Sequence, residues 1–184
     1  LASTYVGHLL GCADPEASNY DEGNTMDDGS CLYSMSIDLD QGANLISFYI
    51  LPEDNSVSNV LSSLEDNVIG IIGEGAAAIQ TSLGNWVGSL AEIECDKGYW
   101  VSVSEATELD IVGVQCGGAN QLYSIHEGVN LISYPYEQSN TISAAIPDLF
   151  EEYFSAIIGE GTAAIQTSPG NWVGSLTELE PGKG

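Results

Sequence analysis

The sequence predicts a mainly β protein with two tandem repeats, each a sandwich- or barrel-like unit carrying one short helix, behind a small acidic loop closed by a disulfide. The first supporting observation is an internal repeat, because residues 71–90 read IIGEGAAAIQTSLGNWVGSL and residues 157–176 read IIGEGTAAIQTSPGNWVGSL. The second is a succession of short apolar runs separated by glycine-rich turns, which is typical of small β-sheets. The third is the acidic stretch between Cys12 and Cys31, which indicates a compact loop.

The repeat extends beyond these blocks in the same register and sets the domain organisation. Residues 42–47 (GANLIS) correspond to residues 128–133 (GVNLIS), and Lys97-Gly98 corresponds to Lys183-Gly184. A Gly-Gly-Ala-Asn stretch between the copies is a turn or linker pattern. We therefore expect an N-terminal strand-like assembly segment (1–10), an acidic disulfide and calcium loop (11–33), a first β repeat (34–116), a linker (117–120) and a second β repeat that lacks its final strand (121–184).

Each repeat is expected to consist of short strands around one helix. Apolar residues recur at helical spacing over residues 57–64, after Ser56, which is a suitable N-cap. In the second copy Pro147 either interrupts the equivalent helix or starts a second turn. In the first repeat, alternation and β-branched content predict strands over residues 37–40, 43–51, 68–72, 76–81, 85–90, 99–103 and 109–114.

The second copy stops where the first continues into a strand. Gly98 runs into Tyr-Trp-Val-Ser-Val, whereas Gly184 is the last residue of the sequence. A β-unit without its last strand has an open edge that invites another chain. Either residues 1–10 of a neighbouring molecule fill that edge, or the polypeptide continues past Gly184 and fills it in cis. The first alternative predicts an assembly interface made of Leu1, Thr4, Tyr5, Val6, Trp172, Val173, Lys183 and Gly184.

The charge is strongly one-sided. The 184 residues include 27 acidic and two basic side chains, for a formal net charge of −25. So negative a field repels nucleic acid and anionic lipid, and both are excluded as expected partners. The sequence also lacks an apolar stretch of the roughly 18 residues that a membrane span needs. Divalent cations or salt screening are expected to offset the repulsion between acidic subunits.

The four cysteines fall into two local pairs, Cys12 with Cys31 and Cys95 with Cys116. An even number of cysteines in a chain with only two histidines fits disulfides formed in an oxidising compartment. Zinc is the alternative, but there is no C-x-x-C spacing and no nearby histidine to support it. We therefore expect an extracellular location, or one on the surface of a cell or virion.

The acidic loop carries the oxygen ligands that a hard cation prefers. Ca²⁺ takes about six to eight oxygen ligands in a flexible cage. The segment also resembles a GCxDPxAxNY…DDGSC module that recurs in secreted and surface proteins of environmental bacteria and their viruses. The resemblance implies a calcium-stabilised, disulfide-closed and non-catalytic mini-module. An acidic turn with Asp and Asn caps and no ion is the alternative. The candidate ligands are Asp14, Asn19, Asp21, Asp27 and Asp28.

The repeats resemble secreted β-modules that open with GWNLIS and close with GKGYW. Here Ala43 replaces the usual tryptophan of the opening, and the closing KGYW motif ends at Trp100 in the first copy. In the second copy that motif is cut after Gly184. The resemblance implies an extracellular, tandem and non-enzymatic module.

Trp86 and Trp172 occupy equivalent positions in the two repeats. They could stack on a sugar, which makes them an alternative glycan platform, or they could anchor the core of each repeat. The Gly-Glu-Gly segments at 73–75 and 159–161 are interpreted as turns, since no phosphate-loop lysine follows them. The sequence suggests no Ser-His-Asp or Cys-His arrangement, so no enzymatic activity is expected.

Together these patterns predict a structural subunit of an extracellular filament or surface fibre. Successive subunits would polymerise by strand donation, so the expected partners are copies of the same chain, with no nucleic acid and no membrane insertion. The alternative is a glycan-binding adhesin or a viral fibre module.

Overall fold

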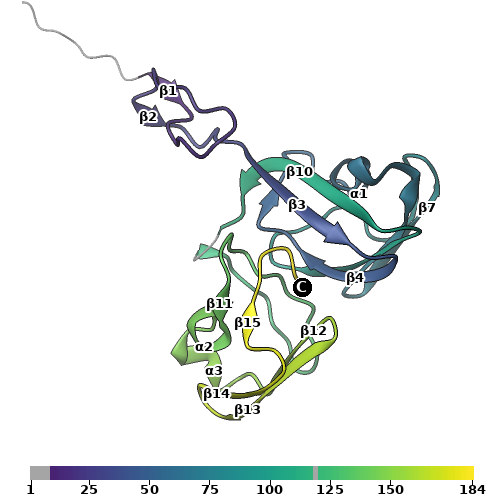
Figure 1. Ribbon diagram of the computed structural model, residues 1–184, viewed down its shortest axis with the longest axis vertical. Coiled ribbons are helices and arrows are strands. Elements are labelled where there is room, and N and C mark those ends of the chain that lie inside the picture. The colour runs from purple at the N-terminus through teal and green to yellow at the C-terminus, as the bar shows by residue number, and fades with distance from the viewer. Residues whose placement is uncertain (1–8, 118–119) are drawn as a thin grey trace, which may run out of the picture.

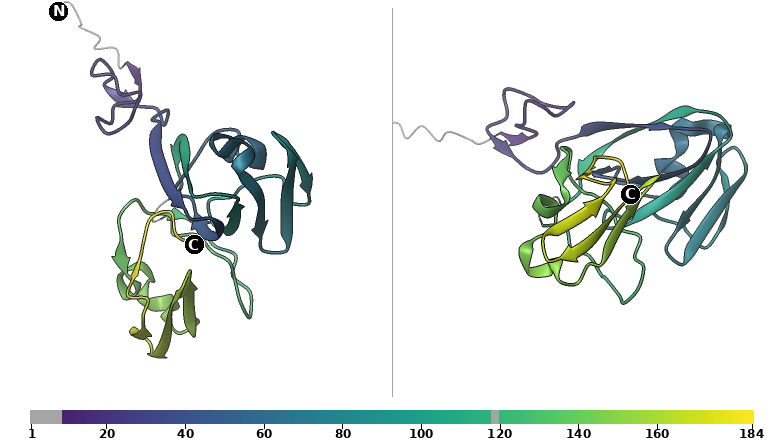
Figure 2. Two further views of the ribbon diagram at one scale, coloured as in Figure 1. Left: turned by 45° about the vertical axis from the view of Figure 1, so that its right-hand side comes forward. Right: turned by 60° about the horizontal axis from the view of Figure 1, so that its bottom comes forward.

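The computed structural model describes residues 9–117 and 120–184, and it confirms a mainly β protein with several sheets (Figure 1). A small N-terminal module leads through a long strand into the first repeat, and the second repeat packs against one end of the first (Figures 1 and 2). The predicted assembly residues Leu1, Thr4, Tyr5 and Val6 lie outside the described residues. Among the residues described, no helix is long and apolar enough to cross a membrane.

The N-terminal module is held by a disulfide rather than by a sheet. Its only regular pairing in the described residues is between the two-residue strands β1 (Leu10–Gly11) and β2 (Met26–Asp27), which run parallel. Cys12 and Cys31 form the predicted disulfide and are buried together with Ala17. A module this small cannot bury enough apolar surface alone, so the cross-link is its main stabilising feature.

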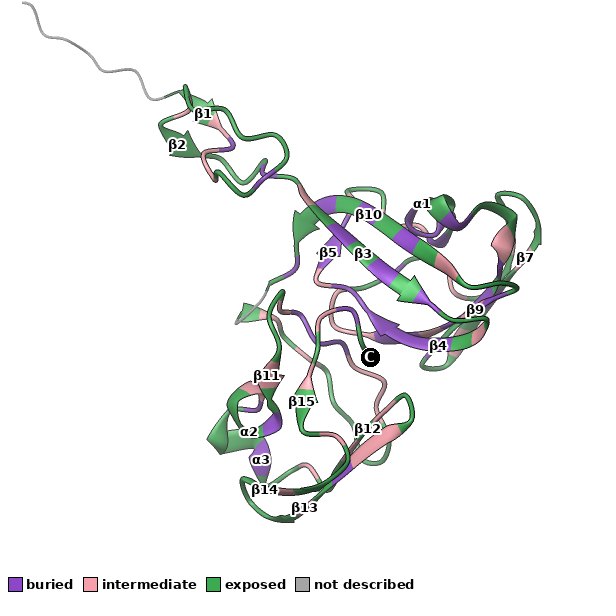
Figure 3. Cartoon of the chain, viewed as in Figure 1, coloured by how far each residue is buried: buried purple, intermediate pink, exposed green. Residues whose placement is uncertain are grey.

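The first repeat is a sandwich of two antiparallel sheets. The smaller sheet has the order β3-β10-β5 and the larger has the order β4-β9-β6-β7-β8. Their buried faces share one core, which runs along β3, β4, β9 and β10 (Figure 3). The strands are β3 (Tyr33–Leu39), β4 (Gly42–Ser47), β5 (Ile50–Leu51), β6 (Val68–Gly73), β7 (Ala76–Ser82), β8 (Asn85–Gly88), β9 (Gly98–Val103) and β10 (Thr107–Gln115).

One helical segment closes the core, as its apolar spacing predicts. It consists of α1 (Val57–Val60) and the 3₁₀ helix η1 (Ser62–Asn67), and the Ser56 side chain caps it by accepting the N–H of Asn59. The apolar side chains at positions 57, 60, 61 and 64 are all buried.

One prediction about this repeat needs correction. The apolar run predicted as one strand over residues 43–51 is broken, because β4 belongs to the larger sheet while β5 pairs with β10 in the smaller one. The strands predicted over residues 99–103 and 109–114 are confirmed as β9, which begins at Gly98, and β10. Both are central in their sheets. The predicted disulfide between Cys95 and Cys116 joins the segment before β9 to the end of β10.

The second repeat reproduces the hairpins of the first on a smaller core. An antiparallel sheet is formed by β12 (Ala156–Gly159), β13 (Thr162–Ser168) and β14 (Asn171–Gly174). A second pair joins β11 (Asn140–Thr141) to β15 (Glu178–Leu179). The helical segment is split into α2 (Ile142–Ala145) and α3 (Asp148–Glu151). Pro147 is the N-cap residue of α3, so the proline starts a second turn.

Candidate assembly interface

The two repeats are joined by a reciprocal β pairing that the sequence analysis missed. Ile46 in β4 forms a bridge with Lys183, and Ile132 forms a bridge with Lys97. These residues are equivalent in the two copies, so each repeat receives the Lys-Gly turn of the other against its own Asn-Leu-Ile-Ser segment. The contact has the form of an interface with approximate two-fold symmetry inside one chain.

The backbone hydrogen bonds of this pairing are also reciprocal. In one direction the N–H of Gly184 donates to the carbonyl of Leu45 (3.2 Å), and the N–H of Ser47 donates to the carbonyl of Gly182 (3.1 Å). In the other direction the equivalent bonds measure 3.0 Å and 3.2 Å, and they join Gly98 to Leu131 and Ser133 to Asp96. Lys183 and Gly184 therefore pair with the first repeat of their own chain.

The glutamates of the two Gly-Glu-Gly turns complete the contact. Glu160 Oε2 accepts the N–H of Leu45 at 3.0 Å, and Glu74 Oε2 accepts the N–H of Leu131 at 2.9 Å. Each Gly-Glu-Gly turn thus reverses the chain and also binds the backbone of the other repeat. The recurrence of the glutamate at the same position of both copies was the available sequence signal.

The contact around Glu74 includes a titratable partner. The imidazole of His126 contacts the Glu74 carboxylate through Nε2 and the carbonyl of Glu127 through Nδ1. The Leu131 N–H, followed by His126, lowers the pKa of the Glu74 carboxyl below its usual value. The Glu127 carbonyl, followed by Glu74, raises the pKa of His126. The chain has Asp40 at the position equivalent to His126, so the Glu160 side lacks this pair.

The sheet of the second repeat has an unpaired edge. In the first repeat β6 lies between β7 and β9, whereas its equivalent β12, within the described part of the chain, pairs only with β13. Ile71 of β6 is fully buried, but the equivalent Ile157 is only half-buried. Leu131 and Ile132 are likewise half-buried, although their counterparts in β4 are buried. This edge is the surface that a further strand would cover.

The position of β9 in the first repeat shows what the second repeat is missing. A Cβ added to Gly73 at the end of β6 would lie 3.1 Å from the ring of Tyr99, which covers this glycine. At the equivalent Gly159, the nearest atoms to such a Cβ are Thr162 Oγ1 at 3.2 Å and a Leu176 methyl at 3.9 Å. The backbone carbonyl of Gly184 follows at 4.0 Å, so this residue lies at the start of the uncovered edge.

The remaining predicted interface residues lie away from that edge. Trp172 and Val173 are in β14, which is separated from β12 by β13. Trp172 packs against the small core around Ile142, and its indole N–H is buried without a hydrogen-bond partner in the described structure. Trp86 packs against the core of the first repeat. Both indoles are therefore placed as core anchors, and stacking on a glycan stays a prediction.

The structure does not gather the predicted calcium ligands into a cage. Each side chain accepts a hydrogen bond from its own loop; Asp14, for example, takes the Glu16 N–H (3.0 Å) and the Tyr33 hydroxyl (2.6 Å). The others accept backbone N–H groups, Asn19 from Leu32, Asp21 from Gly23, Asp27 from Gly29 and Asp28 from Ser30. Within residues 9–117 and 120–184, no three acidic, histidine or cysteine side chains are placed to hold a metal. These contacts are loop caps, and calcium binding stays a prediction.

These contacts also shift the acidity of two groups in the loop. The Tyr33 hydroxyl and then the Glu16 N–H lower the pKa of the Asp14 carboxyl. The same Asp14 contact, followed by partial burial, raises the pKa of Tyr33 to about 12. Asp14 thus remains ionised and ties the loop to the start of β3.

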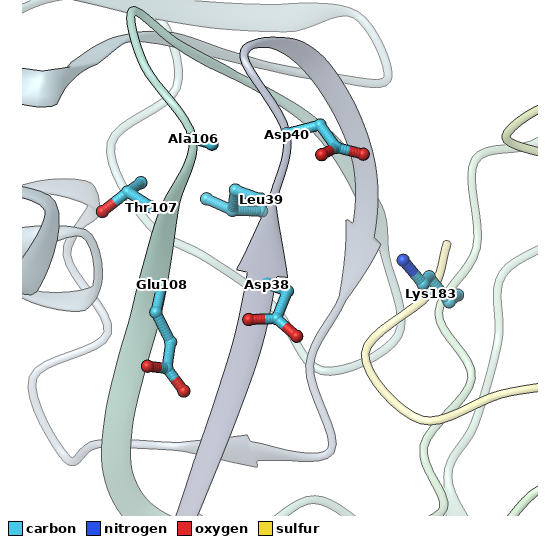
Figure 4. A pocket seen from close by; sticks show the side chains of 7 residues that line it. All are labelled: Asp38, Leu39, Asp40, Ala106, Thr107, Glu108 and Lys183. Carbon is cyan, nitrogen blue, oxygen red and sulfur yellow. The ribbon is translucent and has the colours of Figure 1, made fainter.

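One shallow pocket of about 560 Å³ lies at the end of β3 and β10 (Figure 4). Asp38 and Glu108 are directly opposite in the antiparallel register, so their carboxylates repel each other. Lys183 lines the far side of the pocket and contributes a positive charge. The lining residues are Asp38, Leu39, Asp40, Ala106, Thr107, Glu108 and Lys183. At this pocket Lys183 of the second repeat thus partly offsets the negative charge of Asp38 and Glu108 in the first repeat.

Comparison with protein-family models, curated proteins and solved structures finds no match to this chain.

Proposed function

We propose that this chain is a structural subunit of an extracellular filament or surface fibre, in which successive copies are joined by strand donation. Two observations carry the proposal: in the described residues one edge of β12 has no strand partner, and residues 130–132 are only half-buried. In the first repeat the equivalent space holds β9, which pairs with β4 on one side and β6 on the other. The two disulfides indicate an oxidising, extracellular environment, which suits such a subunit.

A donated strand would supply both hydrogen bonds and buried side chains. In β9 the side chains of Tyr99, Val101 and Val103 are buried, and alternate residues face outward. A comparable strand along β12 would bury about 400 Å² of apolar area, which corresponds to a gross gain on the order of 10 kcal/mol. Association costs reduce this gain, but main-chain pairing and side-chain pockets together give the usual affinity and specificity of strand addition.

Residues 1–10 of a neighbouring copy are the proposed donor. This segment contains no Asp, Glu, Lys or Arg, so it adds no charge to the repulsion between acidic subunits. Leu9 and Leu10, its last two residues, are exposed. The β1–β2 module that follows them stands away from β12 in every view, which favours a donor from another molecule over the chain's own N-terminus (Figures 1 and 2). A contact between different surfaces of identical subunits propagates into a filament.

Electron microscopy of the purified protein and of a variant without residues 1–10 tests the proposal. The parent protein is expected to form filaments, and the deletion variant is expected to remain folded and monomeric. A second variant, Tyr5→Pro with Val6→Pro, keeps the full length of the chain. Proline has no N–H to donate to a strand ladder, so this variant is also expected to prevent assembly.

Filaments that persist after both changes would contradict the donor assignment. An intact mass well above 19.4 kDa, with residues that follow Gly184 protecting β12 in the monomer, would replace donation by completion within one polypeptide.

A further inference from the structure

The outer face of each hairpin sheet carries a row of exposed apolar side chains. In the first repeat the row consists of Ile72, Ile79 and Val87, here called the first apolar row. The equivalent residues of the second repeat, Ile158, Ile165 and Val173, form the second apolar row. All six side chains are between 55% and 69% exposed, so neither row is covered by the described part of the chain.

The residues of each row are neighbours across adjacent strands. Ile79 lies directly opposite Val87, and Ile72 lies opposite Ala77, which places it diagonally to Ile79. Directly opposite residues are about 5 Å apart and diagonal residues about 7–8 Å apart, so each row is continuous across three strands. The pairs Ile165 with Val173 and Ile158 with Ala163 repeat this arrangement in the second sheet.

Both rows lie on surfaces that carry almost none of the protein's charge. Residues 75–91 and residues 161–177 contain no acidic, basic or histidine side chain, although the chain as a whole has a net charge of −25. Two copies can therefore approach each other through these hairpins without opposing carboxylates. Because repulsion is absent here, another copy of the same acidic chain can bind at these hairpins, whereas it is repelled over the rest of the surface.

The internal repeat provides a second, independent argument. Residues 71–90 and 157–176 differ only at Ala76/Thr162 and Leu83/Pro169, whereas residues 48–64 share no identity with 134–150 in the same register. The divergence of the latter segment means that the hairpins have had time to change. Core packing explains why the buried Ala78 and Ala164 match, but it does not explain why the exposed isoleucines and valines match. A contact made by the outer face explains it.

We propose that the first apolar row of one copy packs against the second apolar row of the next copy. The hairpins β7–β8 and β13–β14 lie at separate ends of the molecule, so a copy that uses one row keeps the other free (Figures 1 and 2). Such a contact is heterologous and continues from copy to copy. It uses the outer faces of the sheets, so it does not depend on strand donation to the edge of β12.

Site-directed cross-linking of the full chain tests this contact. All four native cysteines form disulfides, so a single introduced cysteine provides the only free thiol. Ile79→Cys and Ile165→Cys variants are mixed in equal amounts under mild oxidation. The control mixture replaces Ile79→Cys with Val112→Cys, because Val112 is a 54% exposed apolar residue on β10, outside both rows.

The expected product of the first mixture is a dimer in which peptide mapping finds residue 79 joined to residue 165. Its initial rate of formation is expected to exceed that of the control by about tenfold or more, because the contact raises the local thiol concentration. Equal rates in the two mixtures would overturn the proposal. Faster linkage between residue 79 of two molecules than between residues 79 and 165 would also overturn the proposal. The contact would then join two identical surfaces and close into a dimer.

If either variant fails to fold, Val87→Cys and Val173→Cys on the adjacent strands replace the pair, with the same expected and contradicting results. No step requires residues 1–10, so failure of this contact and failure of strand donation are distinguished.

Discussion

The hairpins of residues 71–90 and 157–176 fold alike but lie in different surroundings. Both contain the same register shift, between Gln80 and Ser82 in one copy and between Gln166 and Ser168 in the other. Ile71 is nevertheless fully buried, while the equivalent Ile157 is half-buried. The difference arises from β9, which covers β6 and has no counterpart beside β12 among residues 9–117 and 120–184. Local sequence thus determines the hairpin, while a strand from elsewhere determines how deeply it is buried.

Removal of the main side chain of β9 should give the largest effect on the first repeat. Tyr99→Ala is expected to lower the free energy of unfolding by about 3–5 kcal/mol, because a buried aromatic ring leaves a large cavity. Tyr99 is fully buried, packs 5.9 Å from the Phe48 ring between centroids, and accepts the Glu94 N–H. Urea denaturation followed by tryptophan fluorescence measures the change. Trp100→Ala, on the opposite and half-exposed face of β9, should cost less, and an equal cost would contradict the assignment of faces.

The same substitution at equivalent positions of the two repeats tests how deeply each hairpin is buried. Ile71→Ala is expected to destabilise the protein by about 2–5 kcal/mol, as for other buried isoleucines. Ile157→Ala should cost about 1 kcal/mol, since less apolar area leaves water at this site in the folded state. Chemical denaturation of both variants under one condition provides the measurement. Similar losses would mean that Ile157 is as well covered as Ile71, and that the edge of β12 is closed in solution.

The rates of amide hydrogen exchange should differ between the two repeats at single residues. Ile71 and Ile72 in β6 are expected to exchange at least about 100-fold more slowly than Ile157 and Ile158 in β12, because central strands open only in larger unfolding events. The comparison is made on monomers by mass spectrometry or NMR. In assembled material the two strands should become similarly protected. Unchanged exchange of β12 on assembly would argue against a strand bound there.

The smallest expected effect concerns the pH dependence of the contact between the repeats. The lowered pKa of Glu74 gives a contribution that is present above its ordinary value of 4.5 and is lost as the pH falls through the lowered one. The raised pKa of His126 gives a contribution that is present below 6.5 and is lost as the pH rises through the raised value. Both groups are exposed, so the effect is reduced by solvent and salt.

The pair should therefore stabilise the protein most between pH 4.5 and 6.5. Thermal unfolding across this range is expected to show a slightly flatter profile for His126→Gln than for the parent chain. Identical profiles would show that the pair does not contribute to stability in solution.

The local elements could be predicted from the sequence because their determinants are close together. The helix after Ser56, the break at Pro147 and both disulfides follow from spacing and residue type. The break between β4 and β5 could not be seen. Phe48, between the two strands, is fully buried, and both sheets cover the same core, so burial continues across the break. Periodicity cannot distinguish one long buried strand from two short ones in different sheets.

The contact between the repeats was beyond sequence reasoning for a different reason. Glu74 and Glu160 recur in glycine-rich turns, and their partners Leu45 and Leu131 donate backbone N–H groups, which leave no pattern in side-chain types. Lys183 and Gly184 are predicted to contact a strand of a neighbouring molecule, and that contact stays a prediction. The structure places them against β4 of their own chain.

The hairpins β7–β8 and β13–β14, which carry no charged side chain, limit how copies of this chain can combine. Through these two faces alone, each molecule binds two neighbours, and subunits with two junctions form linear polymers, whereas subunits with more junctions form branched networks. The placement of neutral surface on this molecule therefore restricts branching, whatever the strength of each junction.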